Sequence, residues 1–166
     1  MRKTLILFGL ILMASSAAMA QGETPKAEIA GNYTYIRFSG GANCNGGGGS
    51  IAANLNSWFG VVGDFSECKV TGGNALAYLF GPKIAYRSSG RATPYFQVLF
   101  GGMRLSGGGS SSNAFAMTAG GGLDVKVNSQ VAIRLAQGEY LMTRFGGVRQ
   151  NNFRLESGIV FRFGSR

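Results

Sequence analysis

The chain has 166 residues, which suits one domain of ordinary size. Its 28 glycines have no period of three, which excludes collagen, and its 12 phenylalanines and 6 tyrosines argue against a disordered chain. The formal net charge is +9, but the basic residues are scattered without a cluster, so we expect no nucleic-acid partner. For an exported chain, contact with anionic membrane lipid or lipopolysaccharide explains the excess of basic residues better.

The first 20 residues are organised like a secretory signal peptide. Residues 2–3 are basic, residues 5–13 are apolar, and residues 18–20 read Ala-Met-Ala, which is typical of a cleavage site. The apolar segment is too short for a comfortable transmembrane anchor. We therefore predict a signal peptide over residues 1–20 and one exported domain over residues 21–166.

Large apolar residues then alternate with small or charged ones along the chain, a pattern typical of β-strands. After residue 20 no apolar run approaches the roughly 18 residues that a membrane helix needs. A chain without such helices spans a bilayer only as a closed barrel, because every backbone polar group must be paired internally. The expected strands cover residues 27–38, 48–53, 58–65, 74–87, 93–105, 113–127, 130–143 and 151–163.

Each expected strand has a large apolar face and a face of small or charged residues. The charges are of both signs, so they can pair across a narrow interior while the apolar face contacts lipid. We expect a lumen ion-pair network in which three carboxylates face six bases, leaving an excess for water or anions to balance. Its expected members are Glu28, Lys83, Arg87, Asp124, Lys126, Arg134, Arg154, Glu156 and Arg162.

Two expected strands are irregular. In the strand over residues 130–143, Gln137 and Glu139 fall on the apolar face unless a β-bulge near residues 136–138 restores the alternation. Pro82 lies inside the fourth strand and cannot donate a backbone hydrogen bond, so we expect a bulge or a local distortion there.

The expected connections alternate in length. Three are short turns, over residues 54–57, 88–91 and 128–129, and four are longer or glycine-rich, over residues 39–47, 66–73, 106–112 and 144–150. Short turns at one end and longer loops at the other are typical of outer-membrane barrels. An even number of strands places both termini at the short-turn end.

The two cysteines, Cys44 and Cys68, fall in the first and second of the longer loops. In an oxidising compartment we expect one disulfide that joins these loops, with two free thiols as the alternative. The chain has no histidine, which removes the commonest general base and metal ligand. We therefore expect no enzyme, no cofactor and no metal site.

The chain resembles the small eight-stranded outer-membrane barrels of the outer-membrane protein A type. The resemblance rests on the order and spacing of segments 27–33, 54–65, 93–102, 119–124 and 153–163. It implies an all-β, eight-stranded antiparallel up-and-down transmembrane barrel in the outer membrane of a Gram-negative-type bacterium. We expect a monomer, and we expect the family's peptidoglycan-binding domain to be missing because no residues remain for it after the barrel. The resemblance also implies that the closing strand, with Phe161 and Phe163, is the signal for the outer-membrane assembly machinery, although three residues follow Phe163.

Three functions remain open on the sequence. The leading interpretation is an integral outer-membrane barrel with a side-chain-filled lumen and a structural or surface-exposed role. The alternative is an exported soluble barrel, like a lipocalin, that binds a small apolar ligand, but this requires an apolar cavity where a charged one is expected. The third, a lipid A-modifying membrane enzyme, is disfavoured by the missing histidine.

Overall fold

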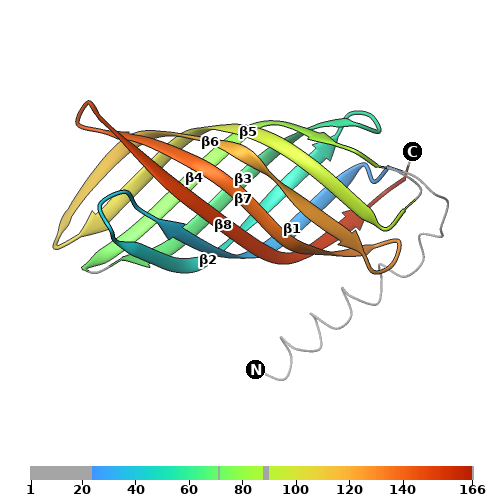
Figure 1. Ribbon diagram of the computed structural model, residues 1–166, viewed down its shortest axis with the longest axis horizontal. Coiled ribbons are helices and arrows are strands. Elements are labelled where there is room, and N and C mark those ends of the chain that lie inside the picture. The colour runs from blue at the N-terminus through green and yellow to red at the C-terminus, as the bar shows by residue number, and fades with distance from the viewer. Residues whose placement is uncertain (1–23, 71, 88–89, 166) are drawn as a thin grey trace, which may run out of the picture.

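The computed structural model describes residues 24–70, 72–87 and 90–165, and the predicted signal peptide lies outside them. The described residues form eight strands: β1 (Ala27–Arg37), β2 (Asn43–Asn54), β3 (Phe59–Val70), β4 (Gly73–Ala85), β5 (Ala92–Gly107), β6 (Ser110–Lys126), β7 (Val131–Phe145) and β8 (Val148–Phe163). Each strand pairs antiparallel with its neighbours in the sequence, and β1 pairs with β8 (Figure 1), so the predicted eight-stranded up-and-down barrel is confirmed. Within these residues no helix is long and apolar enough to cross a membrane.

The barrel closes where β1 lies beside β8. Their ladder runs from Ala27 opposite Phe163 to Arg37 opposite Phe153. The start of β1 and the end of β8 therefore lie together, at the right-hand end of Figure 1, which we call the terminus end. The hairpin that joins β1 to β2 lies at the other end, which we call the far end.

The outer wall of the barrel is apolar, as the alternation predicts. In β4, Leu76, Tyr78, Phe80 and Ile84 are exposed, while Ala75, Ala77, Leu79 and Lys83 between them are buried. In β8, Phe153, Leu155, Ile159, Phe161 and Phe163 are exposed in the same way. The large apolar side chains therefore point away from the lumen, as the wall of a membrane barrel requires.

The prediction of longer loops at one end is wrong. Strands β5 and β6 continue to Gly107 and Ser110, and β7 and β8 to Phe145 and Val148, so most of the glycine-rich segments are strand. Gly108 and Gly109 have φ of 58° and 81°, and Gly146 and Gly147 have φ of 54° and 86°. Two consecutive residues with positive φ make a two-residue hairpin turn whose twist matches the flanking strands. The residues on either side of each turn therefore pair with each other and extend the strands up to the turn.

The predicted bulge in β7 is confirmed, one residue earlier than expected. The pairing of β7 with β8 shifts register between Arg134 and Gln137, and Leu135 and Ala136 are both exposed. The extra outward residue returns Gln137 and Glu139 to the lumen, where both are buried.

The distortion predicted at Pro82 is also present, but it is not a bulge. The ladder between β4 and β5 is interrupted after Phe80 and resumes at Lys83 opposite Gln97, in the same register. A missing N–H donor thus breaks the ladder locally without shifting the strand.

Candidate functional site

The interior of the barrel at the terminus end is organised around one carboxylate. Glu28 accepts a hydrogen bond from Lys83 at 2.8 Å and one from Arg87 at 3.3 Å, and Arg162 lies 3.9 Å away. Arg87 also donates to the side chain of Asn54 at 2.9 Å. The alternation of β1, β4 and β8 directs Glu28, Lys83 and Arg162 into the lumen, and Arg87 follows shortly after β4, so three bases meet one acid here.

The next level of the lumen contains the ion pair of Asp124 with Arg134, at 2.9 Å. Tyr95 lies between two cations: its ring centre is 4.4 Å from the Lys83 ammonium and 5.1 Å from the Arg134 guanidinium. Its hydroxyl donates to Gln137 at 2.5 Å. Tyr95 therefore links the terminus-end group to the middle of the barrel through cation–π contacts.

Arg154 is the centre of the third level, and its side chain is completely buried. Its guanidinium donates to Asp64 at 2.6 Å and to Glu139 at 2.6 Å, and lies 3.6 Å from Glu156. It also donates to Ser66 at 3.3 Å. One cation therefore serves three carboxylates from strands β3, β7 and β8.

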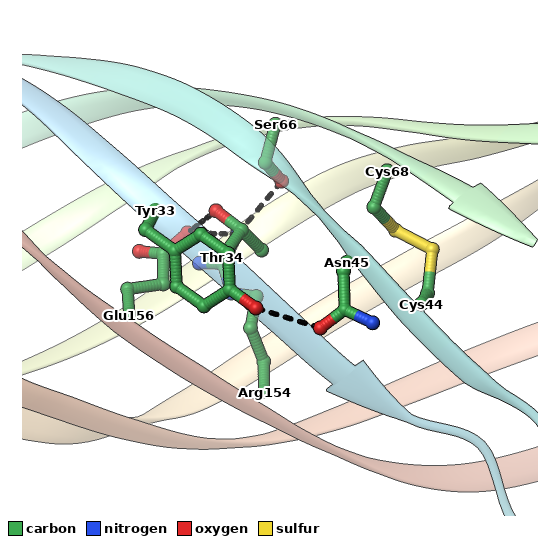
Figure 2. Close-up of a disulfide and its surroundings, with 8 residues drawn as sticks. All are labelled: Tyr33, Thr34, Cys44, Asn45, Ser66, Cys68, Arg154 and Glu156. Atoms are coloured by element: carbon green, nitrogen blue, oxygen red, sulfur yellow. Dashed lines mark hydrogen bonds and ion pairs between the residues drawn. A yellow bond between two sulfur atoms is a disulfide. The ribbon is translucent and has the colours of Figure 1, made fainter.

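The carboxylates around Arg154 have further hydrogen bonds of their own. Glu156 accepts from Thr34 at 2.8 Å and from Gln137 at 2.7 Å, and Glu139 accepts from Gln97 at 2.8 Å. Figure 2 shows Thr34, Ser66, Arg154 and Glu156 converging on one point of the lumen. Because almost every strand contributes, the network braces opposite walls of the barrel.

The charge count differs from the one expected from the sequence. Among the described residues, the network pairs five carboxylates, Glu28, Asp64, Asp124, Glu139 and Glu156, with five bases, Lys83, Arg87, Arg134, Arg154 and Arg162. Asp64 and Glu139 were missed by the sequence analysis. Lys126 was expected in the network, but it is partly exposed at the last position of β6 and makes no ion pair with a described residue. The predicted excess of bases over acids is therefore wrong.

Beyond Arg154, towards the far end, the lumen becomes apolar. Buried apolar side chains from strands β1, β4, β5 and β7 pack together there, and four partly buried apolar side chains lie against them. The buried ones are Ile36, Ala75, Leu79, Leu99, Met103 and Leu141, and the partly buried ones are Phe38, Val70, Leu105 and Phe145. The sequence predicts a charged lumen with small residues between the charges. The interior instead is charged at the terminus end and largely apolar at the far end, where the buried Asn152 donates a hydrogen bond to Thr143 at 3.1 Å. Side chains fill both parts.

The disulfide between Cys44 and Cys68 is present, with the two Cα atoms 5.5 Å apart. Its predicted location in two loops is wrong, because Cys44 belongs to β2 and Cys68 to β3, and both are buried in the lumen. Figure 2 shows the bond crossing between the two strands beside Asn45. The cysteines lie inside the barrel because the segments expected as loops are paired strands.

The disulfide lies next to a run of glycines in β2. Residues 46–49 of β2 are four consecutive glycines, which provide no side chain to specify the register of the strand. The covalent bond from Cys44 to β3 and the hydrogen bond from the Tyr33 hydroxyl to Asn45, at 2.7 Å, hold this strand on both sides. We infer that both contacts set the register of β2.

The family comparison agrees with this architecture. The family described as outer membrane protein beta-barrel domain matches residues 6–163. The chain belongs to this family. No curated protein sequence matches the chain.

Solved structures of other outer-membrane barrels share the fold. Neisserial surface protein A is 15% identical, with 82% of this chain and 96% of that one covered and a TM-score of 0.61. The N-terminal barrel domain of OprF from Pseudomonas aeruginosa is 14% identical, with 84% and 100% covered and a TM-score of 0.60. OprG from the same organism is 10% identical, with 86% and 98% covered and a TM-score of 0.55.

Family membership and the apolar wall together place this barrel in the outer membrane of a Gram-negative-type bacterium, in contact with membrane lipid. The alternative of a soluble lipocalin-like barrel is therefore set aside. Phe161 and Phe163, the expected assembly signal, lie on the lipid-facing side of the closing strand, where Phe163 is opposite Ala27.

Proposed function

We propose that this outer-membrane barrel is a closed element of the membrane with a structural or surface-exposed role, and neither a solute pore nor an enzyme. The observation that carries the proposal is the Arg154 group. A completely buried guanidinium and three buried carboxylates occupy the middle of the lumen, at the level where a pore would need open water.

Two further features support a closed lumen. Eight strands enclose a space only wide enough for side chains to fill. Here the charged groups fill one part of it, and the apolar cluster around Leu99, Met103 and Leu141 fills the other. A hydrated solute would have to displace both groups of side chains. Displacing one partner of a buried ion pair leaves the other charge buried without compensation, which is costly.

The same groups support a non-catalytic role. The lumen carboxylates are engaged by bases or by hydrogen-bond donors, as in the contacts of Glu156 with Thr34 and Gln137. A carboxylate that braces two walls is not available to move a proton to a substrate. The chain also lacks the histidine that the ordinary Ser-His-acid arrangement uses.

Two partners belong to this proposal. The assembly machinery of the outer membrane would recognise the closing strand through Phe161 and Phe163, whose exposed rings are free of packing against the lumen. Lipopolysaccharide would contact the wall on the outer side of the membrane, attracted by the basic excess of the chain.

Liposome swelling tests the closed lumen. The purified protein is reconstituted into vesicles loaded with an impermeant polymer, and the vesicles are diluted into isotonic monosaccharide, with a known porin as the positive control. We expect no swelling above that of empty vesicles. Porin-like swelling by correctly folded protein would show that the Arg154 group and the apolar cluster do not close the barrel.

A further inference from the structure

Five basic side chains point outward from the barrel wall at the far end. They are exposed, and each lies on the outward phase of its strand: Arg37 in β1, Lys69 in β3, Arg104 in β5, Arg144 in β7 and Arg149 in β8. We call these five residues the basic belt. Among the described strands, Glu67 is the only acid that shares their outward phase and exposure, so the belt has a strong positive excess.

The basic belt is confined to one end. At the terminus end the outward side chains of the strands are apolar, as in Ile29, Ile84, Ile133 and Phe161. A scattered charge, as in an ordinary soluble surface, would not produce this separation. The wall therefore has a lipid-facing apolar band that changes to a positively charged one towards the far end.

The belt begins where the lipid-facing aromatics end. Phe115 of β6 is the direct neighbour of Arg144, and Phe153 of β8 is the direct neighbour of Arg37. Strands β5 and β6 have 16 and 17 residues, more than the roughly 9–11 that cross a bilayer. The excess length lies beyond the aromatics, so the belt is at the level of the lipid headgroups.

Arg144 and Arg149 stand directly opposite each other across β7 and β8. Like charges in this position repel and destabilise a sheet. Both arginines donate to neutral groups. Arg149 donates to Asn151 and to the Tyr140 hydroxyl, each at 3.2 Å, and Arg144 donates to the Gly147 carbonyl at 3.4 Å. No carboxylate of the described residues pairs with either, so the two guanidiniums have charge and N–H donors left for an external anion.

The far end faces outward if the termini stay on the side from which the barrel is inserted. An exported chain reaches the membrane from the periplasm, so termini that stay behind lie on the periplasmic side and the hairpins of the far end face outward. The basic belt would then meet the outer leaflet, where lipopolysaccharide presents phosphate groups. Arginine binds phosphate through two parallel N–H donors, which suits a pair of adjacent guanidiniums.

We propose that Arg144 and Arg149 form a phosphate-binding clamp for lipopolysaccharide, with the rest of the basic belt adding long-range attraction. The inference rests on the proposed lipopolysaccharide contact and names the residues and the lipid group that make it. The Tyr140 hydroxyl and Asn151 orient Arg149, and the apolar band below them receives the acyl chains.

The test compares lipopolysaccharide binding by the refolded protein and by R144Q/R149Q. A matched control, K26Q/R91Q, removes two exposed charges at the terminus end, and R144K/R149K retains the charge without the planar donor pair. Binding is measured in detergent micelles with intact and with enzymatically dephosphorylated lipopolysaccharide, after each variant has shown the native gel mobility of a folded barrel.

We expect R144Q/R149Q to weaken binding of the intact lipid by about tenfold or more, since bidentate charge-assisted contacts are lost, with an intermediate loss for R144K/R149K. The control should bind like the original protein, and dephosphorylation should remove the difference between variants. If the unmodified protein binds both lipids equally, the phosphate contact itself is wrong. If it prefers the phosphorylated lipid but R144Q/R149Q behaves like the control, the partner stands and the assigned clamp is wrong.

Discussion

Replacing Arg154 with glutamine tests how much the lumen network contributes to stability. The guanidinium lies within 4 Å of Asp64, Glu139 and Glu156, and no other base of the described residues forms an ion pair with these three. Glutamine preserves part of the hydrogen bonding but leaves the carboxylates without a counter-charge in a buried site. Removing one partner of a buried ion pair costs about 3–5 kcal/mol, so R154Q should lower the free energy of unfolding by this amount.

Two matched variants separate charge from packing. E156Q removes one of the three carboxylates and leaves Arg154 with Asp64 and Glu139, so we expect a smaller loss, about 1 kcal/mol, from the disturbed bonds to Thr34 and Gln137. R91Q makes the same arginine-to-glutamine change at an exposed position outside the strands, and should leave stability unchanged.

Urea unfolding in lipid vesicles measures these differences, followed by the fluorescence of Trp58, the single tryptophan. The order of stability should be the original protein and R91Q first, then E156Q, then R154Q. A loss below about 1 kcal/mol for R154Q would refute the reasoning, because a buried, uncompensated carboxylate group costs more than this.

Further predictions concern the disulfide, the glycines and the closing strand. Cys44 and Cys68 should resist reduction and alkylation in the folded barrel but react after boiling, because both are buried. Ready alkylation of the native protein in the presence of a reductant would contradict this. The variant C44A/C68A should fold, with its free energy of unfolding lowered by about 3 kcal/mol. G46A should destabilise by about 1–3 kcal/mol, because its Cβ would collide with the backbone at Glu67 and Cys68, whereas G63A, which meets no atom within 4 Å, should have little effect in the same unfolding assay. F163A should reduce the heat-modifiable, membrane-inserted fraction relative to F80A, which also removes an exposed wall aromatic; equal insertion of the two variants would argue against Phe163 as the assembly signal.

The strands with a strong contrast between their two faces could be predicted from sequence. In β4 and β8 the large outward residues alternate with inward residues that are mostly small or charged, Leu79 being an exception, and the structure keeps this phase. The bulge in β7 could be predicted for a related reason: without it Gln137 and Glu139 would contact lipid, and burying them in hydrocarbon is costly. The lumen location of Glu139 depended on that bulge, which is why Glu139 was not included in the expected network.

Other features lacked such a contrast. Asp64 lies in β3, where Val61 faces outward and its neighbour Val62 faces inward. Because both faces of this strand have an apolar residue, the sequence does not show which face points into the lumen. The glycine- and serine-rich segments have low intrinsic strand propensity and were interpreted as loops. In the structure, pairs of glycines with positive φ form tight turns. The residues on either side of each turn then pair with each other as strands, as Leu105 does with Ser112. The cysteines were therefore placed in loops although they lie inside the barrel.

The central claim is that side chains close the lumen, and single-channel recording in a planar bilayer tests it most directly. The unmodified, heat-modifiable protein should give no large, stable conductance, because the Arg154 group and the apolar cluster beyond it occupy the passage. E156Q, which loosens the network, should give at most a small conductance. Large, stable, porin-like steps from the unmodified protein would contradict the closed barrel and the structural or surface-exposed role derived from it.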